Sequence, residues 1–311
     1  MRILVTGGAG FIGSHIVERL LHLNHTVSVI DNFSTGKREN IRNVVNEITL
    51  HEGDIRDTVL LNDIIHGIDV VIHQAALSSV PQSIADPIGT NDINVNGTLK
   101  ILQTAKDLEV KKIIFASSAA IYGDDPELPK HEQMKPYPLS PYAISKLIGE
   151  YYCKVFSGLY GLKTVSLRYF NVFGPRQDPK SEYAAVIPKF IQSMLKDEKP
   201  VIYGDGFQSR DFIFIDSVVD ANIKAMFCEC ESGLVMNCAS GVKTTINDLV
   251  GSVNDIIKKN IKPIYQESRP GDIKHSYADI SLIKGKLNFG EIINFKDGLK
   301  KTIKYWTEEL T

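Results

Sequence analysis

The chain has 311 residues, of which 43% are hydrophobic, and a formal net charge of −2. This length suits two lobes around one cleft, and the balanced charge gives no basic face for nucleic acid. No segment has the length and apolarity of a membrane span, and the amino terminus lacks the layout of a signal peptide. We therefore expect a cytoplasmic protein that works on neither nucleic acid nor a membrane.

The four cysteines do not form a metal-binding pattern. Cys228 and Cys230 have a spacing that zinc sites do not use, and no second Cys or His pair completes a site with them. We expect no bound metal, and reduced thiols of the kind found in cytoplasmic proteins. The other two cysteines are Cys153 and Cys238.

The first half of the chain alternates strand and helix patterns. This alternation predicts βαβ units in a parallel sheet with helices on both faces, which binds ligands at the carboxyl ends of its strands. Short β-branched apolar runs predict strands at residues 3–6, 26–30, 48–51, 70–73, 113–116 and 164–169. Helical periodicity predicts helices at residues 11–23, 37–46, 58–66, 91–108 and 142–159.

After Gly174-Pro175 the predicted elements become shorter, and the loops carry more Pro, Gly and charge. We expect residues 1–174 to form a Rossmann-type nucleotide-binding domain and residues 175–311 a smaller α/β lobe for the substrate. The segment near residues 212–238 is expected to return to the first sheet through the apolar run at 212–215. Further helices are predicted at residues 184–196, 217–230, 246–259 and 296–308.

The first predicted strand leads into a glycine-rich turn, Gly7-Gly8-Ala9-Gly10-Phe11-Ile12-Gly13, and then into a helix. Such glycines let the backbone approach a pyrophosphate placed at the helix N-terminus. An acid follows the second strand: Asp31 is expected to bind the ribose hydroxyls of NAD and to repel the extra phosphate of NADP. Capping of the next helix is the alternative role for Asp31. Lys37 and Arg38 could serve a 2′-phosphate, but they also suit a solvated helix start.

Tyr142 and Lys146 open a later helix, for which Ser140 suits the N-cap and Pro141 the first turn. Residues four apart share a helix face, so the phenol and the ammonium are expected to be neighbours. A nearby cation and the positive helix end both lower a phenol pKa from its usual value of about 10. We therefore expect Tyr142 to exchange protons, although the same spacing also arises by chance from a core tyrosine and a solvated lysine.

Several motifs together make the chain resemble a known family. They are residues 7–13, Asp31, 73–76 (HQAA), 94–98 (NVNGT), 117–123 (SSAAIYG), the Tyr142/Lys146 pair, 168–175 (RYFNVFGP), 209–212 (SRDF) and 269–272 (RPGD). In this order they resemble the extended short-chain dehydrogenase/reductase superfamily, and the later ones resemble its UDP-hexose 4-epimerases. The resemblance covers nearly the whole chain and implies NAD as the cofactor and a UDP-sugar as the substrate.

The resemblance also implies roles for the residues. Tyr142 is the expected base, Lys146 lowers its pKa and binds the nicotinamide ribose, and Ser118 binds the reacting hydroxyl. Ser117 is expected to support Ser118, although either could be an ordinary strand-end serine. The expected cofactor contacts are Gly7, Gly10, Phe11, Ile12, Gly13, Asp31, Asn32, Asp54, Ile55, Ala75, Asn94, Tyr142 and Lys146.

The residues after Ser118 separate the branches of the family. Related 4,6-dehydratases carry an Asp-Glu pair beside the active-site Ser or Thr, and UDP-glucuronate decarboxylases place an acid in this segment. Ala119 and Ala120 stand here instead, so no carboxylate is present to eliminate water. The remaining chemistry is oxidation at C4 to a 4-keto sugar and return of the hydride to the opposite face, which regenerates NAD.

The nucleotide diphosphate is expected to bind in the second lobe. Arginine forks suit a diphosphate, and Arg210 and Arg269 stand in the matching motifs. Tyr203 is expected to stack on uracil, although it could equally be a core tyrosine of an edge strand. The expected substrate contacts are Ser118, Asn171, Tyr203, Arg210, Arg269, Asp272 and Ser276.

Ser276 bears on the identity of the sugar. In the family, a tyrosine at this position restricts the pocket to glucose and galactose, whereas a small residue leaves space for an N-acetyl group. Residues 117–130 and 169–187 also resemble the subgroup that prefers N-acetylated substrates. We therefore predict interconversion of UDP-GlcNAc and UDP-GalNAc with some activity on UDP-Glc and UDP-Gal. Should Ser276 be a loop serine one place out of register, a UDP-glucose 4-epimerase with broad tolerance is the alternative.

A different class of function is an NAD-binding regulator that has lost catalysis. Such proteins usually lose one of the reacting residues, whereas Ser118, Tyr142 and Lys146 are all present. The helices predicted at 91–108 and 142–159 are long and partly apolar. The equivalent pair forms a four-helix dimer interface in the family, so a homodimer is expected.

Overall fold

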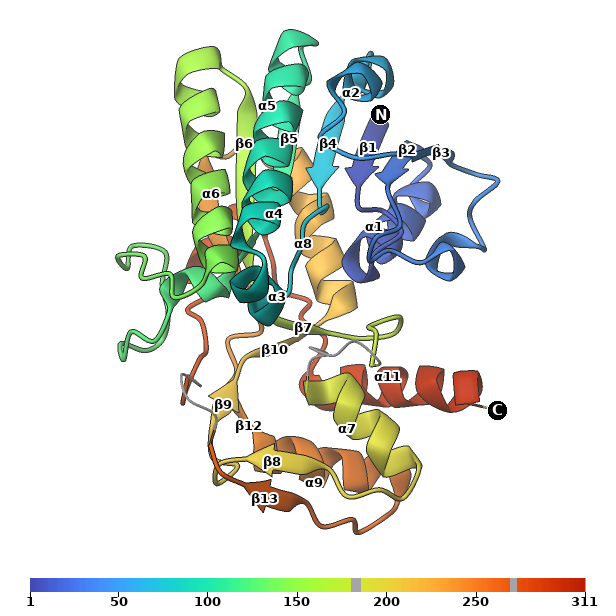
Figure 1. Ribbon diagram of the computed structural model, residues 1–311, viewed down its shortest axis with the longest axis vertical. Helices are drawn as coiled ribbons and strands as arrows, with labels where there is room; N and C mark the ends of the chain where they lie inside the picture. The colour runs from blue at the N-terminus through green and yellow to red at the C-terminus, as the bar shows by residue number, and fades with distance from the viewer. Residues whose placement is uncertain (180–185, 269–272, 311) are drawn as a thin grey trace.

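The computed structural model describes residues 1–179, 186–268 and 273–310. Its centre is a seven-stranded sheet with the order β11-β6-β5-β4-β1-β2-β3, and every neighbouring pair runs parallel (Figure 1). The parallel α/β sheet predicted from the sequence is thereby confirmed. The strands are β1 (Arg2–Thr6), β2 (Thr26–Asp31), β3 (Thr49–Glu52), β4 (Val70–His73), β5 (Lys112–Ser118), β6 (Lys163–Tyr169) and β11 (Leu234–Cys238).

Helices cover both faces of this sheet, because side chains along a buried strand point alternately to its two faces. Ile3 and Val5 pack into the core under α1 and α8, whereas Leu4 between them packs into the core under α2, α5 and α6. The carboxyl ends of the strands point toward the lower part of the molecule (Figure 1). The flanking helices are α1 (Phe11–His22), α2 (Thr58–Ile65), α3 (Val80–Ala85), α4 (Pro87–Asn91), α5 (Gly97–Asp107), α6 (Pro141–Tyr160), α8 (Ile215–Phe227) and α10 (Ser281–Leu287).

One predicted helix is wrong. In place of a helix at residues 37–46 the structure has a single 3-10 turn, η1 (Arg38–Ile41), followed by irregular chain. The segment is rich in Asn and β-branched residues, which disfavour helices. Asn40 uses its side-chain amide to donate to the carbonyl oxygen of Ala9 (2.8 Å), which ties the segment to the glycine-rich turn.

The helix predicted at residues 91–108 begins earlier and is interrupted. α4 passes into a π-helical turn, η2 (Asp92–Asn96), before α5 begins at Gly97. Gly97 lies so close to Ile55 that an added Cβ would be 2.6 Å from its Cδ1 atom. The π turn widens the helix where Asn94 is buried and points to the loop after β4, and such turns often mark functional sites.

The strand expected to return to the sheet was misplaced. The apolar run at residues 212–215 forms β10 (Phe212–Phe214), which pairs with β7 (Asn171–Phe173) in a separate two-stranded sheet. The seventh strand of the main sheet is instead β11, which follows α8 and pairs with β6. The segment 212–238 therefore does return to the main sheet, but the strand that joins the sheet is 234–238.

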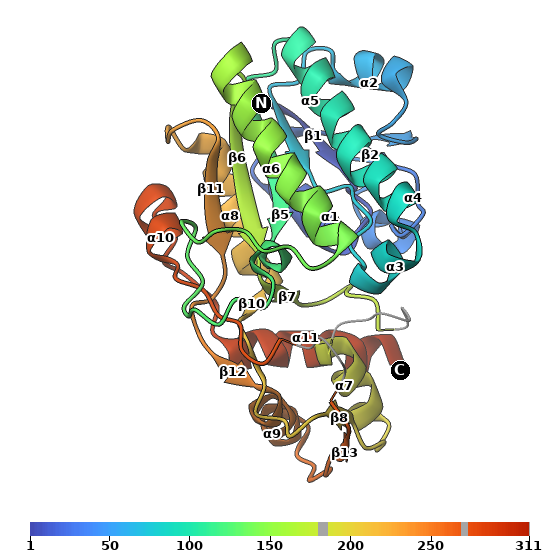
Figure 2. The same ribbon diagram turned by 60° about the vertical axis from the view of Figure 1, so that its left-hand side comes forward.

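A second group of elements, called here the lower region, lies below the carboxyl edge of the main sheet (Figures 1 and 2). Its strands form only short pairs: β10 with β7, β12 with β9, and β13 with β8. Three helices of this region pack against one another. The further elements of the lower region are α7 (Val186–Leu195), β8 (Val201–Tyr203), β9 (Ser209–Arg210), β12 (Thr244–Thr245), α9 (Ile246–Ile257), β13 (Ile264–Gln266) and α11 (Phe295–Leu310).

The cysteines differ in part from the expectation of reduced thiols. Cys228 and Cys230, just after α8, are joined by a disulfide with an S–S distance of 2.09 Å. Cys153 and Cys238 are free and buried in the core. With one residue between them, the two thiols come together just after the end of α8.

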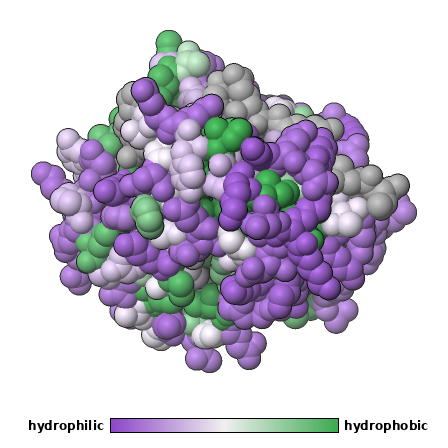
Figure 3. All heavy atoms as spheres, turned by 90° about the horizontal axis from the view of Figure 1, so that it is seen from below, coloured by the Kyte–Doolittle hydropathy of each residue, from purple (hydrophilic) through white to green (hydrophobic). Residues whose placement is uncertain are grey.

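The surface of the lower region, seen from below, is largely hydrophilic, with hydrophobic residues in small separate groups (Figure 3). Within the described part of the chain, no helix combines the length and apolarity needed to cross a bilayer.

Candidate active site

A cavity of about 660 Å³ lies at the carboxyl edge of the main sheet. This is the position where parallel α/β sheets bind ligands. Thirteen of the residues predicted from the sequence line it. They are Gly7, Gly10, Phe11, Ile12, Gly13, Asp31, Asn32, Asp54, Ile55, Ala75, Ser117, Tyr142 and Lys146.

The glycine-rich turn leaves no room for side chains. Gly7 has a φ of +68°, and a Cβ there would be 2.8 Å from the backbone nitrogen of Ala75. A Cβ on Gly13 would be only 2.1 Å from the carbonyl oxygen of Gly7. The turn therefore brings bare backbone to the cavity, as close approach to a pyrophosphate requires.

The N-terminus of α1 faces this cavity without a side-chain cap. Gly10 is the N-cap residue and has no side chain to accept from the first amide groups. These amides are orphan donors at the positive end of the helix, and an anion is their natural partner. The first residues of the helix, Phe11, Ile12 and Gly13, line the cavity, so the site fits a dinucleotide pyrophosphate.

Asp31 ends β2 and is nearly buried at the cavity wall. Its Oδ2 accepts from the Ala9 nitrogen and its Oδ1 from the Phe33 nitrogen, each at 2.9 Å. Burial raises the pKa of this carboxyl, while the two backbone bonds act in the opposite direction. Each carboxylate oxygen has a second lone pair, so Asp31 still has acceptors for two ribose hydroxyls.

The cations near Asp31 already have carboxylate partners. Lys37 binds Asp178 at 2.8 Å, and Arg38 pairs with Glu52 while stacking on the Phe33 ring. Neither arrangement leaves a guanidinium or ammonium aimed at a 2′-phosphate. Together with the carboxylate of Asp31, this favours NAD over NADP.

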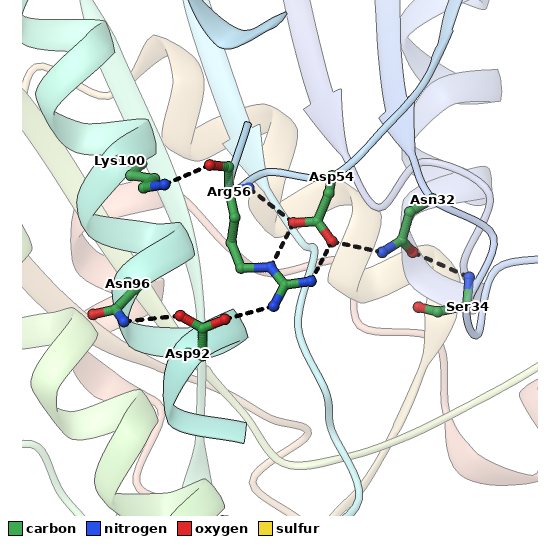
Figure 4. A network of polar contacts seen from close by, with 7 residues as sticks. All are labelled: Asn32, Ser34, Asp54, Arg56, Asp92, Asn96 and Lys100. Carbon is green, nitrogen blue, oxygen red and sulfur yellow. Dashed lines mark hydrogen bonds and ion pairs between the residues drawn. The ribbon is translucent and has the colours of Figure 1, made fainter. Parts of the chain in front are cut away.

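A polar network fixes the loop after β3 (Figure 4). Arg56 binds Asp54 through two nitrogens, at 2.8 and 2.7 Å, and reaches Asp92 of η2 at 2.5 Å. Asn32 donates to Asp54 from the end of β2 (3.1 Å), and the Arg56 contact lowers the pKa of Asp54 to about 2. The network joins the loops after β2 and β3 to the π turn, and so holds Asn32, Asp54 and neighbouring Ile55 at the cavity wall.

Tyr142 lies in the first turn of α6, where Pro141 is the first residue and the Ser140 hydroxyl accepts from the Ala143 nitrogen (3.2 Å). The predicted helix start is therefore confirmed. Ser118, the last residue of β5, lies near enough to Tyr142 to oppose the effect of burial on its pKa, although Ser118 is not among the residues that line the cavity. The structure thus brings the predicted acid–base residue and the predicted hydroxyl-binding residue together.

The expected effect of Lys146 on Tyr142 is not found. Burial raises the pKa of Tyr142, and the opposing influence comes from the Ser118 hydrogen bond. Lys146 donates to the carbonyl oxygen of Ala116 (2.8 Å), and its ammonium is 6.0 Å from the centre of the Tyr142 ring. Burial also lowers the pKa of Lys146 to about 8. In the structure without a ligand, burial and Ser118 set the direction of the Tyr142 pKa, and Lys146 is not among its causes.

Ser117, predicted as a catalytic residue, uses its hydroxyl elsewhere. The hydroxyl donates to the Glu150 carboxylate (2.5 Å), which is buried against Arg168. Its side chain therefore contacts an ion pair beneath the sheet edge. This placement favours a supporting role for Ser117 over contact with a reacting group.

Asn94 does not line the cavity, but it supports the wall from behind. Its Oδ1 accepts from the Leu77 nitrogen (2.8 Å), and its Nδ2 donates to the Leu77 oxygen and to Ser145, each at 3.0 Å. The Ser145 hydroxyl in turn donates to the carbonyl oxygen of Tyr142 (2.8 Å). Asn94 thereby joins the loop after β4 to the first turn of α6.

A second cavity, of about 280 Å³, is lined by elements of the lower region. Asn171, Tyr203 and Arg210, all predicted as substrate contacts, line it from β7, β8 and β9. Gln177 lines both cavities and donates to the Val172 carbonyl oxygen (3.0 Å). The structure therefore brings three of the seven predicted substrate residues to a site beside the first cavity.

Arg269 and Asp272 lie outside the described residues. Ser276 is half-buried beside β9, where its nitrogen donates to the carbonyl oxygen of Ser209 (3.1 Å), and it lines neither cavity.

Sequence reasoning missed several lining residues. Gln74 and Tyr169 line the first cavity and contact each other at 2.9 Å, and both also bind the buried Asn222 of α8. Gln177 and Asp178 follow β7. Gln74 and Tyr169 end or follow strands, and this strand-end position is the signal that could have identified them.

The chain is similar over its whole length to known proteins. The model of the NAD dependent epimerase/dehydratase family matches residues 3–239. A putative UDP-glucose 4-epimerase of Methanocaldococcus jannaschii is 42% identical over 97% of both chains. A UDP-N-acetylglucosamine 4-epimerase of Methanobrevibacter ruminantium, solved with UDP-N-acetylmuramic acid, is 45% identical with a TM-score of 0.95, covering 99% of this chain and 98% of that one.

The UDP-glucose 4-epimerase of Thermotoga maritima, solved with UDP-glucose, is 39% identical with a TM-score of 0.95 over the full length of both chains. These similarities run from end to end and include the cavity described above. The chain belongs to the NAD-dependent epimerase/dehydratase family, and NAD is its cofactor.

Proposed function

We propose that the protein interconverts UDP-GlcNAc and UDP-GalNAc by inverting the C4 hydroxyl of the sugar. The broader activity, NAD-dependent 4-epimerisation of a UDP-sugar, is supported by full-length relatives at 39–45% identity. The observation that carries the proposal is that Tyr142, which lines the first cavity beside Lys146, lies next to Ser118. The second cavity beside it offers a place for the nucleotide diphosphate.

The residues that hold NAD are proposed from their positions. The turn at residues 7–13 and the N-terminus of α1 bind the pyrophosphate, and Asp31 accepts from the ribose hydroxyls. Asp54 and Ile55 bound the adenine end, and Lys146 binds the nicotinamide ribose. NAD, when bound, supplies the acceptor that removes a hydride from C4 and later returns it.

The chain itself moves the proton. Tyr142 takes the proton of the C4 hydroxyl as the carbonyl forms and returns it to the oxygen when the opposite epimer is made. Ser118 hydrogen-bonds the C4 oxygen and the Tyr142 hydroxyl, and this bond favours the phenolate. Because neither epimer is more oxidised than the other, the cofactor ends each cycle unchanged.

The segment after Ser118 supports epimerisation over elimination. Ala119 and Ala120 begin the short turn η3 (Ala119–Tyr122), and the Ala120 nitrogen donates to the Ser118 hydroxyl (3.1 Å). Neither side chain can protonate a leaving hydroxyl or accept a proton from C5. A 4,6-dehydratase would need such a group here.

The choice of an N-acetylated sugar rests on Ser276, on the resemblance of residues 117–130 and 169–187 to that subgroup, and on the relative solved with UDP-N-acetylmuramic acid. Arg210, Arg269, Asp272 and Asn171 are proposed to bind the diphosphate and sugar, and Tyr203 the uracil. A UDP-glucose 4-epimerase with broad tolerance is the second candidate, because relatives named for UDP-glucose are nearly as similar.

Steady-state kinetics on both substrate pairs test the sugar. We expect kcat/KM for UDP-GlcNAc to exceed that for UDP-Glc by roughly 10- to 200-fold, the range for loss of one contacting group. Equal or higher efficiency on UDP-Glc would contradict the N-acetyl assignment and favour the second candidate. No turnover on any UDP-sugar would favour an NAD-binding regulator instead.

We also propose a homodimer formed through α6. Ile144, Tyr151, Val155 and Leu159 are exposed and recur at helical spacing, so they form an apolar stripe along one side of the helix. Light scattering at micromolar protein is expected to give twice the monomer mass, and a monomer would refute the dimer. The cytoplasmic location and the division into domains at residue 174 stay predictions.

A further inference from the structure

A buried ionic cluster lies directly behind the proposed reacting residues. The Ser117 hydroxyl donates to Oε1 of Glu150 (2.5 Å), and Arg168 binds both oxygens of the same carboxylate through Nε (2.8 Å) and Nη2 (2.7 Å). All three side chains are almost completely buried. The cluster does not touch the reacting hydroxyls, so the proposed mechanism gives it no chemical step.

The three members come from the three elements that meet at the reacting site. Ser117 immediately precedes Ser118 on β5, and Arg168 is its direct partner across the β5–β6 pair. Glu150 lies on α6, one turn beyond Lys146 and two turns beyond Tyr142. One carboxylate therefore ties the helix that carries the phenol to the strand that carries its hydrogen-bond partner.

The cluster also contacts the turn that follows Ser118. The Arg168 guanidinium lies 4.8 Å from the centre of the Tyr122 ring, at the end of the turn that begins after Ser118. The Tyr122 hydroxyl donates to Oδ1 of Asn237 (2.6 Å), whose amide donates to the carbonyl oxygen of Lys130 (2.9 Å). The turn η3, which follows Ser118, is thus attached at both of its ends to the same buried network.

Stability alone does not explain such a cluster. Removing two charges from water costs more than their attraction commonly returns, and well-packed apolar residues often stabilise a core as well or better. What an ion pair does provide is direction, because a guanidinium and a carboxylate fix each other's orientation through two parallel bonds. Here the fixed orientation of the Glu150 carboxylate limits how α6 can rotate about its own axis and slide along β5.

We infer that Ser117, Glu150 and Arg168 are positioning residues that hold Tyr142 within hydrogen-bond reach of Ser118. The inference rests on the proposed function, in which Tyr142 must become a phenolate. The Ser118 bond favours that phenolate, and burial opposes it. A helix that shifts away from β5 weakens the bond, so a higher pH is then needed to ionise Tyr142.

The other titratable groups around Tyr142 are not members of the cluster. Lys146 is on the same helix and moves with Tyr142, and His73 of β4 is neutral because burial lowers its pKa to about 3. Asp92 of the π turn pairs with Arg56. Ser117→Ala removes no charged group, so a change in its pH dependence reports the Tyr142–Ser118 contact rather than a lost neighbouring charge.

The main test is the apolar variant Ser117→Ala/Glu150→Leu/Arg168→Met, assayed as the NAD-loaded enzyme on a UDP-sugar. We expect a folded protein with unchanged KM and NAD content. At pH 7 its kcat falls about tenfold, and the pH of half-maximal kcat rises by about one unit, because each unit is tenfold in phenolate. A kcat that is unchanged, or lowered equally at every pH, would overturn the inference.

Ser117→Ala alone covers the case in which the triple variant does not fold. It leaves the Glu150–Arg168 ion pair intact and removes one bond to β5, so a smaller upward shift of about half a unit is expected. Arg168→Lys keeps the charge but loses the two-pronged contact, and should lie between wild type and the triple variant. A profile of Ser117→Ala that coincides with the wild type would contradict the inference.

Thr164→Val is the matched control. Thr164 is buried on β6, and its hydroxyl also joins this strand to α6, through the Cys153 carbonyl oxygen (3.0 Å), about one turn further from Tyr142 than Glu150 is. Its pH profile should match the wild type. Tyr142→Phe separates the two hypotheses: an active Tyr142→Phe enzyme refutes the proposed function, whereas an inactive one with unshifted cluster variants refutes only the positioning role.

Discussion

The main sheet and the lower region hold their proposed site residues in opposite ways. Around the sheet, Gly7, Asp31, Ser118 and Tyr142 each stand at a strand end or in the first turn of a helix, and long parallel pairings fix those positions. In the lower region, Asn171, Tyr203 and Arg210 come from strands of two or three residues in three separate small sheets. The cofactor end is therefore set by repeated local geometry, and the substrate end by long-range assembly.

This difference suits the proposed chemistry. An epimerase must keep its cofactor bound through many cycles, whereas the sugar must rotate between two orientations. The first cavity, at the edge of the long parallel strands, suits a dinucleotide that stays bound. The second cavity, built from the short strand pairs of the lower region, suits a sugar nucleotide that changes its orientation. Changes at the two ends should therefore have separable effects, and the following substitutions test that separation.

Tyr142→Phe should have the largest effect. The ring stays in place, but the group that exchanges the proton with the C4 oxygen is gone, and acid–base catalysis of this kind contributes about 100- to 10,000-fold. We expect kcat to fall by about 1,000-fold, with NAD content and KM for the UDP-sugar within a factor of a few. Activity within tenfold of wild type would exclude Tyr142 as the acid–base residue.

Gly13→Ala should damage the cofactor end next most strongly. The added Cβ would sit 2.1 Å from the Gly7 carbonyl oxygen, and overpacking of this kind costs about 1–3 kcal/mol. We expect up to about 100-fold weaker NAD binding by calorimetry. Gly251→Ala on α9 is the control, since no atom lies within 4 Å of its added Cβ; it should stabilise the fold by about 1 kcal/mol. Unchanged NAD affinity in Gly13→Ala would contradict the role of the turn.

Arg210→Ala should affect only the substrate end. Hydrogen bonds to charged groups contribute about 1.5–3 kcal/mol, so loss of a diphosphate contact predicts a rise in KM of about 30-fold. The purified variant should contain as much NAD as the wild type. A KM within twofold of wild type, or loss of NAD from the variant, would break the proposed separation of the two ends.

Lys146→Met tests the buried ammonium through stability. The pKa of Lys146 is lowered from 10.5 to about 8 in the folded protein, so between these values the unfolded chain binds more protons and stability rises with pH. Relative to Lys146→Met, the wild-type apoenzyme should gain about 2 kcal/mol of unfolding free energy from pH 7 to 9.5. Parallel curves from urea unfolding would show that the ammonium is not desolvated.

The sheet region was also the better predicted of the two from sequence. Glycines at 7–13, an acid after the second strand and the Tyr142–Lys146 spacing are local signals, and parallel βα units then place them at one edge. The wrong helix at 37–46 fell where Asn40 and its neighbours serve loop contacts, which periodicity does not report. The return strand was misassigned because 212–215 is the more continuously apolar run, whereas the partner of each strand is decided only by the fold.

The electrostatics of the site could be predicted less well. A lysine four residues after a tyrosine suggested a lowered phenol pKa, but the ammonium bonds to Ala116 and burial dominates. The Glu150–Arg168 pair was missed because its members lie 18 residues apart and meet only when α6 packs against β6. The position of Ser276 depends on how its loop packs against β9, so sequence spacing alone could not place it relative to the proposed substrate site.

Proton NMR of the purified enzyme with UDP-GlcNAc and no added NAD tests the central claim most directly. The account predicts that the anomeric signal of UDP-GalNAc appears and grows to a constant ratio with UDP-GlcNAc, from either starting sugar, without net change in NAD or NADH. A deoxy-keto product, a requirement for stoichiometric NAD, or no new anomeric signal with any UDP-sugar would contradict it.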